Sequence, residues 1–160
     1  SDESFSSRLA DIAVQASEGP KALPKLLNAM KDRDAAVRYW GAVGVGNIGK
    51  PAKSAAKQMR AALKDESAVV RIAAARALCR LDMPKDALPV LARELDRGEQ
   101  WERLHAAIVL DQIDEMARPV ISEMHAALEP REKLYAKGKY TVRVINRALN
   151  QLEGTDRKVN

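Results

Sequence analysis

One interval recurs along this chain of 160 residues: a leucine or methionine is followed eight residues later by an arginine. The three pairs are Met30 and Arg38, Leu63 and Arg71, and Leu95 and Arg103. Successive anchors lie 33 and 32 residues apart, and Leu128 follows 33 residues later. Each arginine opens an apolar run rich in small residues. A period of this size is typical of stacked helical repeats, so the sequence predicts a small all-α solenoid.

The composition agrees with a helical fold. Hydrophobic residues make up 46% of the chain but aromatic residues only 4%, so the apolar mass is mostly Ala, Leu and Val. Small and straight side chains suit close helix packing more than the core of a sandwich or barrel. The longest apolar runs fall far short of the roughly 18 residues that span a bilayer. We therefore expect one helical domain, no strands and no transmembrane helix.

Periodicity and breakers predict one helical domain over residues 1–152, followed by a polar tail at 153–160. A first helix at 4–16 is interpreted as a terminal cap, or as the second helix of a repeat that begins before residue 1. We therefore expect no targeting peptide at the start of this sequence. About four helix pairs follow, at residues 21–48, 51–81, 85–113 and 117–152.

The second helix of each pair shows more than one apolar stripe. Counted from the arginine, positions +1, +4, +7 and +10 are apolar or small in all three regular repeats. The twelve residues are Tyr39, Ala42, Val45, Ile48, Ile72, Ala75, Leu78, Leu81, Leu104, Ala107, Leu110 and Ile113. Steps of three drift by about 60° on a helix. These helices are therefore expected to be covered on two sides, and the glycines at 41, 44 and 46 then require close helix approach.

The segments LNAMKDRDAAVRYWGAVGVGNIG and MRAALKDESAVVRIAAARALCRL resemble HEAT repeats, and the resemblance covers roughly residues 21–152. It implies an all-α, right-handed α-α superhelix. It also implies a ladder in which a turn aspartate pairs with the helix arginine. The matching residues are Arg38 with Asp32 or Asp34, Arg71 with Asp65, and Arg103 with Asp96 or Glu99. We expect these arginines at the core edge, in a structural role and not as ligand contacts.

The aromatic residues Tyr39, Trp40 and Trp101 stand at helix starts and are predicted to fill gaps between helices.

The fourth repeat is irregular, because 15 residues instead of eight separate Leu128 from Arg143. The candidate anion or partner surface lies there: Arg131, Lys133, Tyr135, Lys137, Lys139 and Tyr140. Such a segment suits phosphate or sulfate groups. A solvated loop, or a surface docked on another domain, explains it at least as well.

Catalytic and metal-binding motifs are not found. His105 and His125 are each followed by alanine, so HExxH is absent. Cys79 sits inside ARALCRL and is predicted to be a buried, inert thiol. We therefore expect no catalytic residue, no cofactor and no metal site in this chain.

A further resemblance concerns the parent protein. The run VRYWGAVGVGNIG and the ending YTVRVINRALNQLEGT are similar to the HEAT-like region that follows the catalytic domain of some bacterial sulfatases. It implies an accessory role on the catalytic domain of the same chain, sulfated polysaccharide as a possible ligand, and a periplasmic or extracellular location. Otherwise a cytoplasmic location is expected.

Two other partner classes remain open. A net charge of +5 permits nucleic-acid binding, as in the HEAT-like alkylpurine glycosylases, which the chain resembles in architecture. A line of Arg76, Arg80 and Arg147 on a concave face would favour this function. A stand-alone adaptor that binds another protein is the common use of such solenoids.

Overall fold

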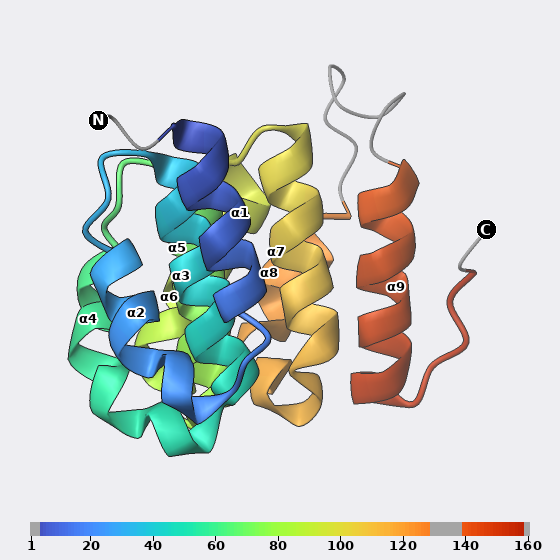
Figure 1. The fold of residues 1–160 in the computed structure, drawn as a ribbon. Coiled ribbons are helices and arrows are strands. Elements are labelled where there is room, and N and C mark those ends of the chain that lie inside the picture. Colours follow the sequence, from blue (N-terminus) through green and yellow to red (C-terminus); the bar gives the residue numbers. More distant parts are fainter. Residues whose placement is uncertain (1–3, 129–138, 159–160) are drawn as a thin grey trace. The chain divides into compact units, whose positions relative to one another are not determined.

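The computed structural model describes residues 4–128 and 139–158, and within these ranges the chain forms helices and no strand. The prediction of an all-α, HEAT-like fold is confirmed. The α-helices are α1 (Phe5–Gln15), α2 (Leu23–Ala29), α3 (Ala35–Ile48), α4 (Ala56–Ala62), α5 (Ala68–Arg80), α6 (Pro84–Arg97), α7 (Gln100–Gln112), α8 (Ile121–Ala126) and α9 (Lys139–Glu153) (Figure 1).

In three of the predicted pairs the first α-helix begins several residues after the pair does, because a 3₁₀ helix precedes it: η1 (Pro20–Ala22), η2 (Lys50–Ala55) and η3 (Asp114–Val120). Pro20 is the first residue of η1 and directly follows Gly19, while Pro51 is the second residue of η2, which follows Gly49. Both glycines have a positive φ. Proline supplies no backbone donor and disfavours α geometry in the residue before it. The α-helix therefore begins only after this first tight turn.

The described residues fall into two compact units, divided between Ala87 and Leu88. In the first unit, α3 packs between α1 and α5, while α2 packs against α1 and α3, and α4 against α5 (Figure 1). Second helices thus form one layer and first helices the other. The single domain predicted over residues 1–152 stays a prediction.

The core of the first unit confirms that its second helices are covered on two sides. Ala42 and Val45 of α3 and Ala75 and Leu78 of α5 are all completely buried. Leu26 of α2 is also completely buried. Each second helix therefore presents apolar atoms to its own first helix and to its neighbours in the layer.

Glycines set the distance between α2 and α3. A Cβ atom at Gly41 would lie 2.9 Å from the Leu26 carbonyl oxygen, and one at Gly44 only 2.4 Å from Leu26 Cδ2. Neither position has room for a methyl group. The close helix approach expected from these glycines is confirmed, and it compensates for their low helix propensity.

In the second unit, α7 and α9 lie side by side, and η3 and α8 pack against α9 (Figure 1). Arg147 Nε of α9 donates to Asp111 Oδ1 of α7 over 3.1 Å. Further along the sequence on both sides, the Gln151 amide of α9 donates to Asp114 Oδ1 of η3, just after the end of α7, over 2.7 Å. Because the two contacts advance together, α7 and α9 run in the same direction.

Candidate interaction surface and the arginine ladder

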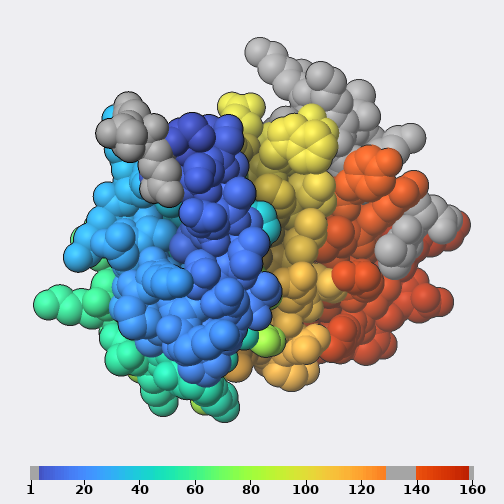
Figure 2. Space-filling model, viewed as in Figure 1, coloured from blue at the N-terminus to red at the C-terminus, as the bar shows by residue number. Residues whose placement is uncertain are grey.

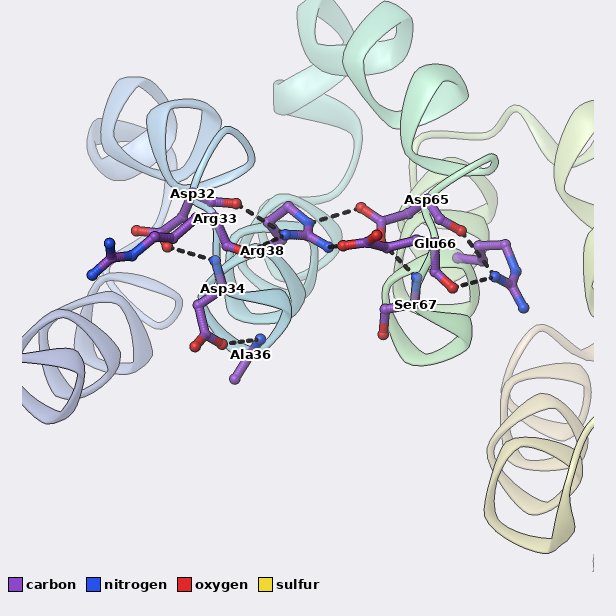
Figure 3. A network of polar contacts seen from close by, with 9 residues as sticks. Asp32, Arg33, Asp34, Ala36, Arg38, Asp65, Glu66 and Ser67 are labelled. Atoms are coloured by element: carbon purple, nitrogen blue, oxygen red, sulfur yellow. Dashed lines mark hydrogen bonds and ion pairs between the residues drawn. The ribbon is translucent and has the colours of Figure 1, made fainter.

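Arg38 joins two consecutive turns of the first unit (Figure 3). Its Nε and Nη2 donate to the two carboxylate oxygens of Asp65 over 2.8 and 3.0 Å. Its Nη1 donates to the carbonyl oxygens of Asp32 and Arg33, each over 3.0 Å. Only 8% of the residue is exposed. A buried guanidinium with this many acceptors is a structural tie between repeats.

The pairing is shifted by one repeat from the one expected within each repeat. The carboxylate that faces Arg38 belongs to Asp65 of the following turn, while Asp32 of its own turn offers its backbone carbonyl. The Asp32 carboxylate instead accepts from Arg8 Nε over 3.1 Å. Asp34 caps α3 by accepting from the Ala36 amide. Arg8 of α1 therefore holds the place in the ladder that Arg38 holds in α3.

The turns before α3 and α5 are built alike. Asp32 Oδ1 accepts from the Asp34 amide over 2.8 Å, and Asp65 Oδ1 accepts from the Ser67 amide over 2.9 Å. Arg71 then donates to the carbonyl oxygens of Asp65 and Glu66, over 2.8 and 3.0 Å. The expected Asp65–Arg71 pair is thus a contact with the backbone of Asp65, since its carboxylate is engaged by Arg38.

Arg103 is the equivalent residue in the second unit, with 7% of its surface exposed. Its Nε donates to the Leu95 carbonyl oxygen over 2.8 Å, and its Nη2 to the Ala127 carbonyl oxygen over 3.3 Å. These carbonyls lie near the ends of α6 and α8. Arg103 thereby satisfies acceptors that helix ends leave open.

The electrostatics of the Arg38 pair agree with a structural role. Burial raises the pKa of Asp65, but the hydrogen bonds from Arg38 and from the Ser67 amide outweigh burial and hold that pKa below the usual range of an aspartate. The Asp65 hydrogen bond likewise raises the pKa of Arg38, against the opposing effect of burial. Both groups are therefore ionised at neutral pH and stabilise each other in the fold.

Most of the predicted basic surface lies outside the described residues: Arg131, Lys133, Tyr135 and Lys137. Lys139 is the first residue of α9. Tyr140, in the first turn of α9, is 64% exposed, and the guanidinium carbon of Arg143 lies 5.6 Å from the centroid of its ring. Arg143 is exposed and does not occupy the buried place of Arg103.

The packing role predicted for the three aromatic residues is wrong for Trp101. Tyr39 and Trp40 are half-buried and meet edge to face with centroids 5.6 Å apart, but Trp101 is 65% exposed. It lies in the first turn of α7. Trp101 stands two residues before Arg103. Around the helix axis, it therefore lies about 150° from the midpoint of the four apolar positions of this repeat, residues 104, 107, 110 and 113. That angle was the available signal of exposure.

Trp101 and Tyr140 lie at the same end of the second unit, because α7 and α9 run side by side in the same direction and each aromatic residue is the second of its helix. The side chains of α7 and α9 form adjoining bands on the face shown in Figure 2. We call Trp101, Tyr140 and Arg143 the aromatic end. Sequence reasoning found Tyr140 but missed Trp101.

Other candidate groups have structural explanations. Cys79 is buried, and burial raises the pKa of its thiol to about 12, so the thiolate is scarce at neutral pH. His125 Nε2 lies 2.7 Å from Glu153 Oε1.

In residues 4–128 and 139–158, no group of three or more potential ligands could hold a metal ion. The helices in these ranges are too short or too polar to cross a membrane.

The fold and the ladder define an all-α protein built from stacked helix pairs that arginines tie together. The family model described as HEAT repeats matches residues 23–111. This match covers more than half of the sequence, and the chain belongs to the HEAT repeat family. No curated protein matches it.

Proposed function

We propose that this chain is a non-catalytic scaffold that binds another protein, and that the aromatic end of the second unit contacts the partner. The observation that carries the proposal is the exposure of Trp101 and Tyr140, at 65% and 64%, on adjacent helices. Large aromatic side chains are usually buried in a domain of this size. Exposed together at one end, they resemble the anchors of a binding surface.

The composition of the aromatic end supports a protein partner. Trp, Tyr and Arg are the residues most enriched among those that dominate binding energy at interfaces. Trp101 and Tyr140 are each held on a helix, so little conformational entropy is lost when they are covered. Arg143 above Tyr140 adds a cation that can pair with a carboxylate of the partner.

The basic segment belongs to the same proposal through the sequence. Arg131, Lys133, Tyr135, Lys137 and Lys139 immediately precede Tyr140 along the chain. The positive charge of the arginine and the three lysines would attract an acidic partner toward the aromatic end and raise the association rate. Replacing Lys133, Lys137 and Lys139 by glutamine should therefore slow association and weaken its dependence on salt.

The nucleic-acid alternative has weaker support. It rested on a line of Arg76, Arg80 and Arg147, and Arg147 is engaged by the Asp111 carboxylate. A neutralised arginine contributes little to the release of counterions that drives binding to phosphates. The protein-binding function explains the exposed aromatic residues, and the arginine line does not.

The narrower form of the proposal makes the chain an accessory domain of a bacterial sulfatase, with the catalytic domain of the same protein as the partner. Its support is the resemblance of the ending YTVRVINRALNQLEGT to such domains. The gene sequence upstream of residue 1 tests it. A catalytic domain with a CxPSR-type motif supports this placement, and an upstream region without one refutes it.

The protein-binding function is tested with peptides selected on the chain from a random library. We expect Trp101→Ala with Tyr140→Ala to weaken peptide binding at least about tenfold, while circular dichroism and the melting midpoint stay close to the wild type. The matched control is Phe5→Ala with Val14→Ala, which removes two other exposed apolar side chains. Undiminished binding by the Trp101 and Tyr140 variant would refute the proposed surface.

A further inference from the structure

The first unit carries two arginines on the outward side of its layer of second helices. Arg76 and Arg80 stand one turn apart on α5, five and nine residues after Arg71. Around the helix axis, these two positions lie about 130° and 170° from the midpoint of the four apolar positions of this repeat, residues 72, 75, 78 and 81. Arg76 is half-buried and Arg80 is exposed. Both positions therefore lie away from the apolar side of α5.

Neighbouring residues of α3 hold Arg76 in place. A Cβ atom at Gly46 would lie 3.0 Å from Arg76 Nη1, so the absence of a side chain there makes room for the guanidinium. Asn47 Oδ1 accepts from Arg76 Nη1 over 3.4 Å. The same amide donates through Nδ2 to the carbonyl oxygen of Ala16, the C-terminal cap of α1, over 3.1 Å, which fixes its orientation. Arg76 is thus a positioned cation.

The two arginines also repel each other. Burial lowers the pKa of Arg76, and the charge of Arg80 lowers it further, with Tyr39 acting in the opposite direction. Like charges one turn apart on a helix destabilise it. An anion that contacts both guanidinium groups would remove this repulsion and add charge-assisted hydrogen bonds.

We propose that Arg76 and Arg80, with Asn47 as a positioning residue, bind the carboxylates of an acidic peptide segment of a protein partner. Trp40 and Val43, half-buried residues of α3, supply apolar surface on the same outward side. A peptide that carries acidic and apolar side chains matches this combination. The inference adopts the protein-binding class of the proposed function but concerns a different unit from the aromatic end.

The number of cations favours a peptide over a polyphosphate. The positions of α3 that correspond to Arg76 and Arg80 hold Val43 and Asn47, and those of α1 hold Ala13 and Ser17. The charge is therefore a local pair on one helix and does not extend across the layer. Nucleic-acid binding without sequence preference uses a positive groove that follows the backbone over several nucleotides. A pair of carboxylates needs only two guanidinium groups.

The test measures binding of a terminally blocked hexaglutamate peptide to the full chain by calorimetry at low salt, with hexaglutamine as the neutral peptide. We expect Arg76→Gln with Arg80→Gln to weaken hexaglutamate binding at least about tenfold. Arg80→Gln alone, at an exposed position, gives a second variant whose fold is not at risk. The matched control is Lys53→Gln with Lys57→Gln, which removes two exposed charges at the same spacing from η2 and α4.

In nuclear magnetic resonance spectra, hexaglutamate should shift the side-chain signals of Arg76, Arg80 and Asn47. An equal loss of affinity in the lysine control would overturn the site, because net charge alone would then explain binding. Equal binding of hexaglutamine, or displacement by inorganic phosphate at the same concentration, would overturn the acidic-peptide specificity. Tighter binding of duplex DNA at these arginines would assign the site to nucleic acid instead. Retained hexaglutamate binding in the Trp101 and Tyr140 variant would separate this site from the aromatic end.

Discussion

At the scale of single residues, Arg38 concentrates the contacts that tie two repeats together. It spans from the backbone of the turn before α3 to the carboxylate of the turn before α5. Because the side chains of Arg38 and Asp65 are only 10% and 12% exposed, water cannot replace the lost partner if either is removed.

Replacing Arg38 by alanine is therefore expected to lower the free energy of unfolding by about 3 kcal/mol. Arg71→Ala should cost about 1 to 3 kcal/mol, since its donors to two backbone carbonyls are lost. Urea denaturation at neutral pH measures both. Arg97→Ala, with a side chain 80% exposed, is the control and should change stability by less than about 0.5 kcal/mol. An unchanged midpoint for Arg38→Ala would show that this arginine is not structural.

The lowered pKa of Asp65 predicts that the free energy of unfolding depends on pH. The hydrogen bonds from Arg38 and the Ser67 amide lower its pKa in the folded chain, so the unfolded state binds a proton more readily. The stabilisation is therefore complete above about pH 5 and declines as the pH falls through the folded pKa. The stability difference between wild type and Asp65→Asn should be constant from pH 7 to 5 and shrink below pH 4. A difference that persists unchanged to about pH 3 would rule out this linkage.

The sequence indicated which arginines would be held by the fold but not which group holds each one. An arginine that opens an apolar helix run must lie near the core edge, and Arg38 and Arg103 do. The choice between the carboxylate of its own turn and that of the next depends on how two repeats stack. That information lies in a contact between residues 27 positions apart.

At the scale of elements, the second helices follow their sequence closely. The helix pair predicted at residues 21–48 ends where α3 ends, because Gly49, with φ of 70°, stops the helix there, and Asp34 caps its start. The first helices could not be predicted as well. A proline near a helix start is compatible with an α-helix or a 3₁₀ turn, and packing decides between them.

The close contact between α2 and α3 predicts the effect of Gly44→Ala. Alanine would improve helix propensity by about 1 kcal/mol, but its Cβ would overlap buried Leu26 and approach Ala16 Cα to 3.0 Å. We expect a net destabilisation of about 1 to 3 kcal/mol in thermal or urea unfolding. Ala10→Gly, at an exposed position of α1, reports propensity alone and should cost about 1 kcal/mol. A more stable Gly44→Ala chain would contradict the packing of α2 on α3.

At the scale of the whole molecule, regular and irregular features have different roles. The arginines that repeat with the period of the chain tie helices and turns together within each unit. The residues assigned to binding are the exceptions to the repeat: Trp101 and Tyr140 where other repeats have smaller residues, and Arg76 with Arg80. Periodicity could reveal the scaffold and the helical angle of Trp101, but that Trp101 and Tyr140 are exposed at the same end of two adjacent helices required the fold.

Hydrogen exchange on the chain with and without a library-selected peptide tests the proposed division between scaffold and binding surface most directly. We predict slower exchange at the start of α7 and of α9, beside Trp101 and Tyr140, with exchange unchanged in the ladder turns at residues 31–34 and 64–67. Protection confined to those turns, with none at the starts of α7 and α9, would contradict it.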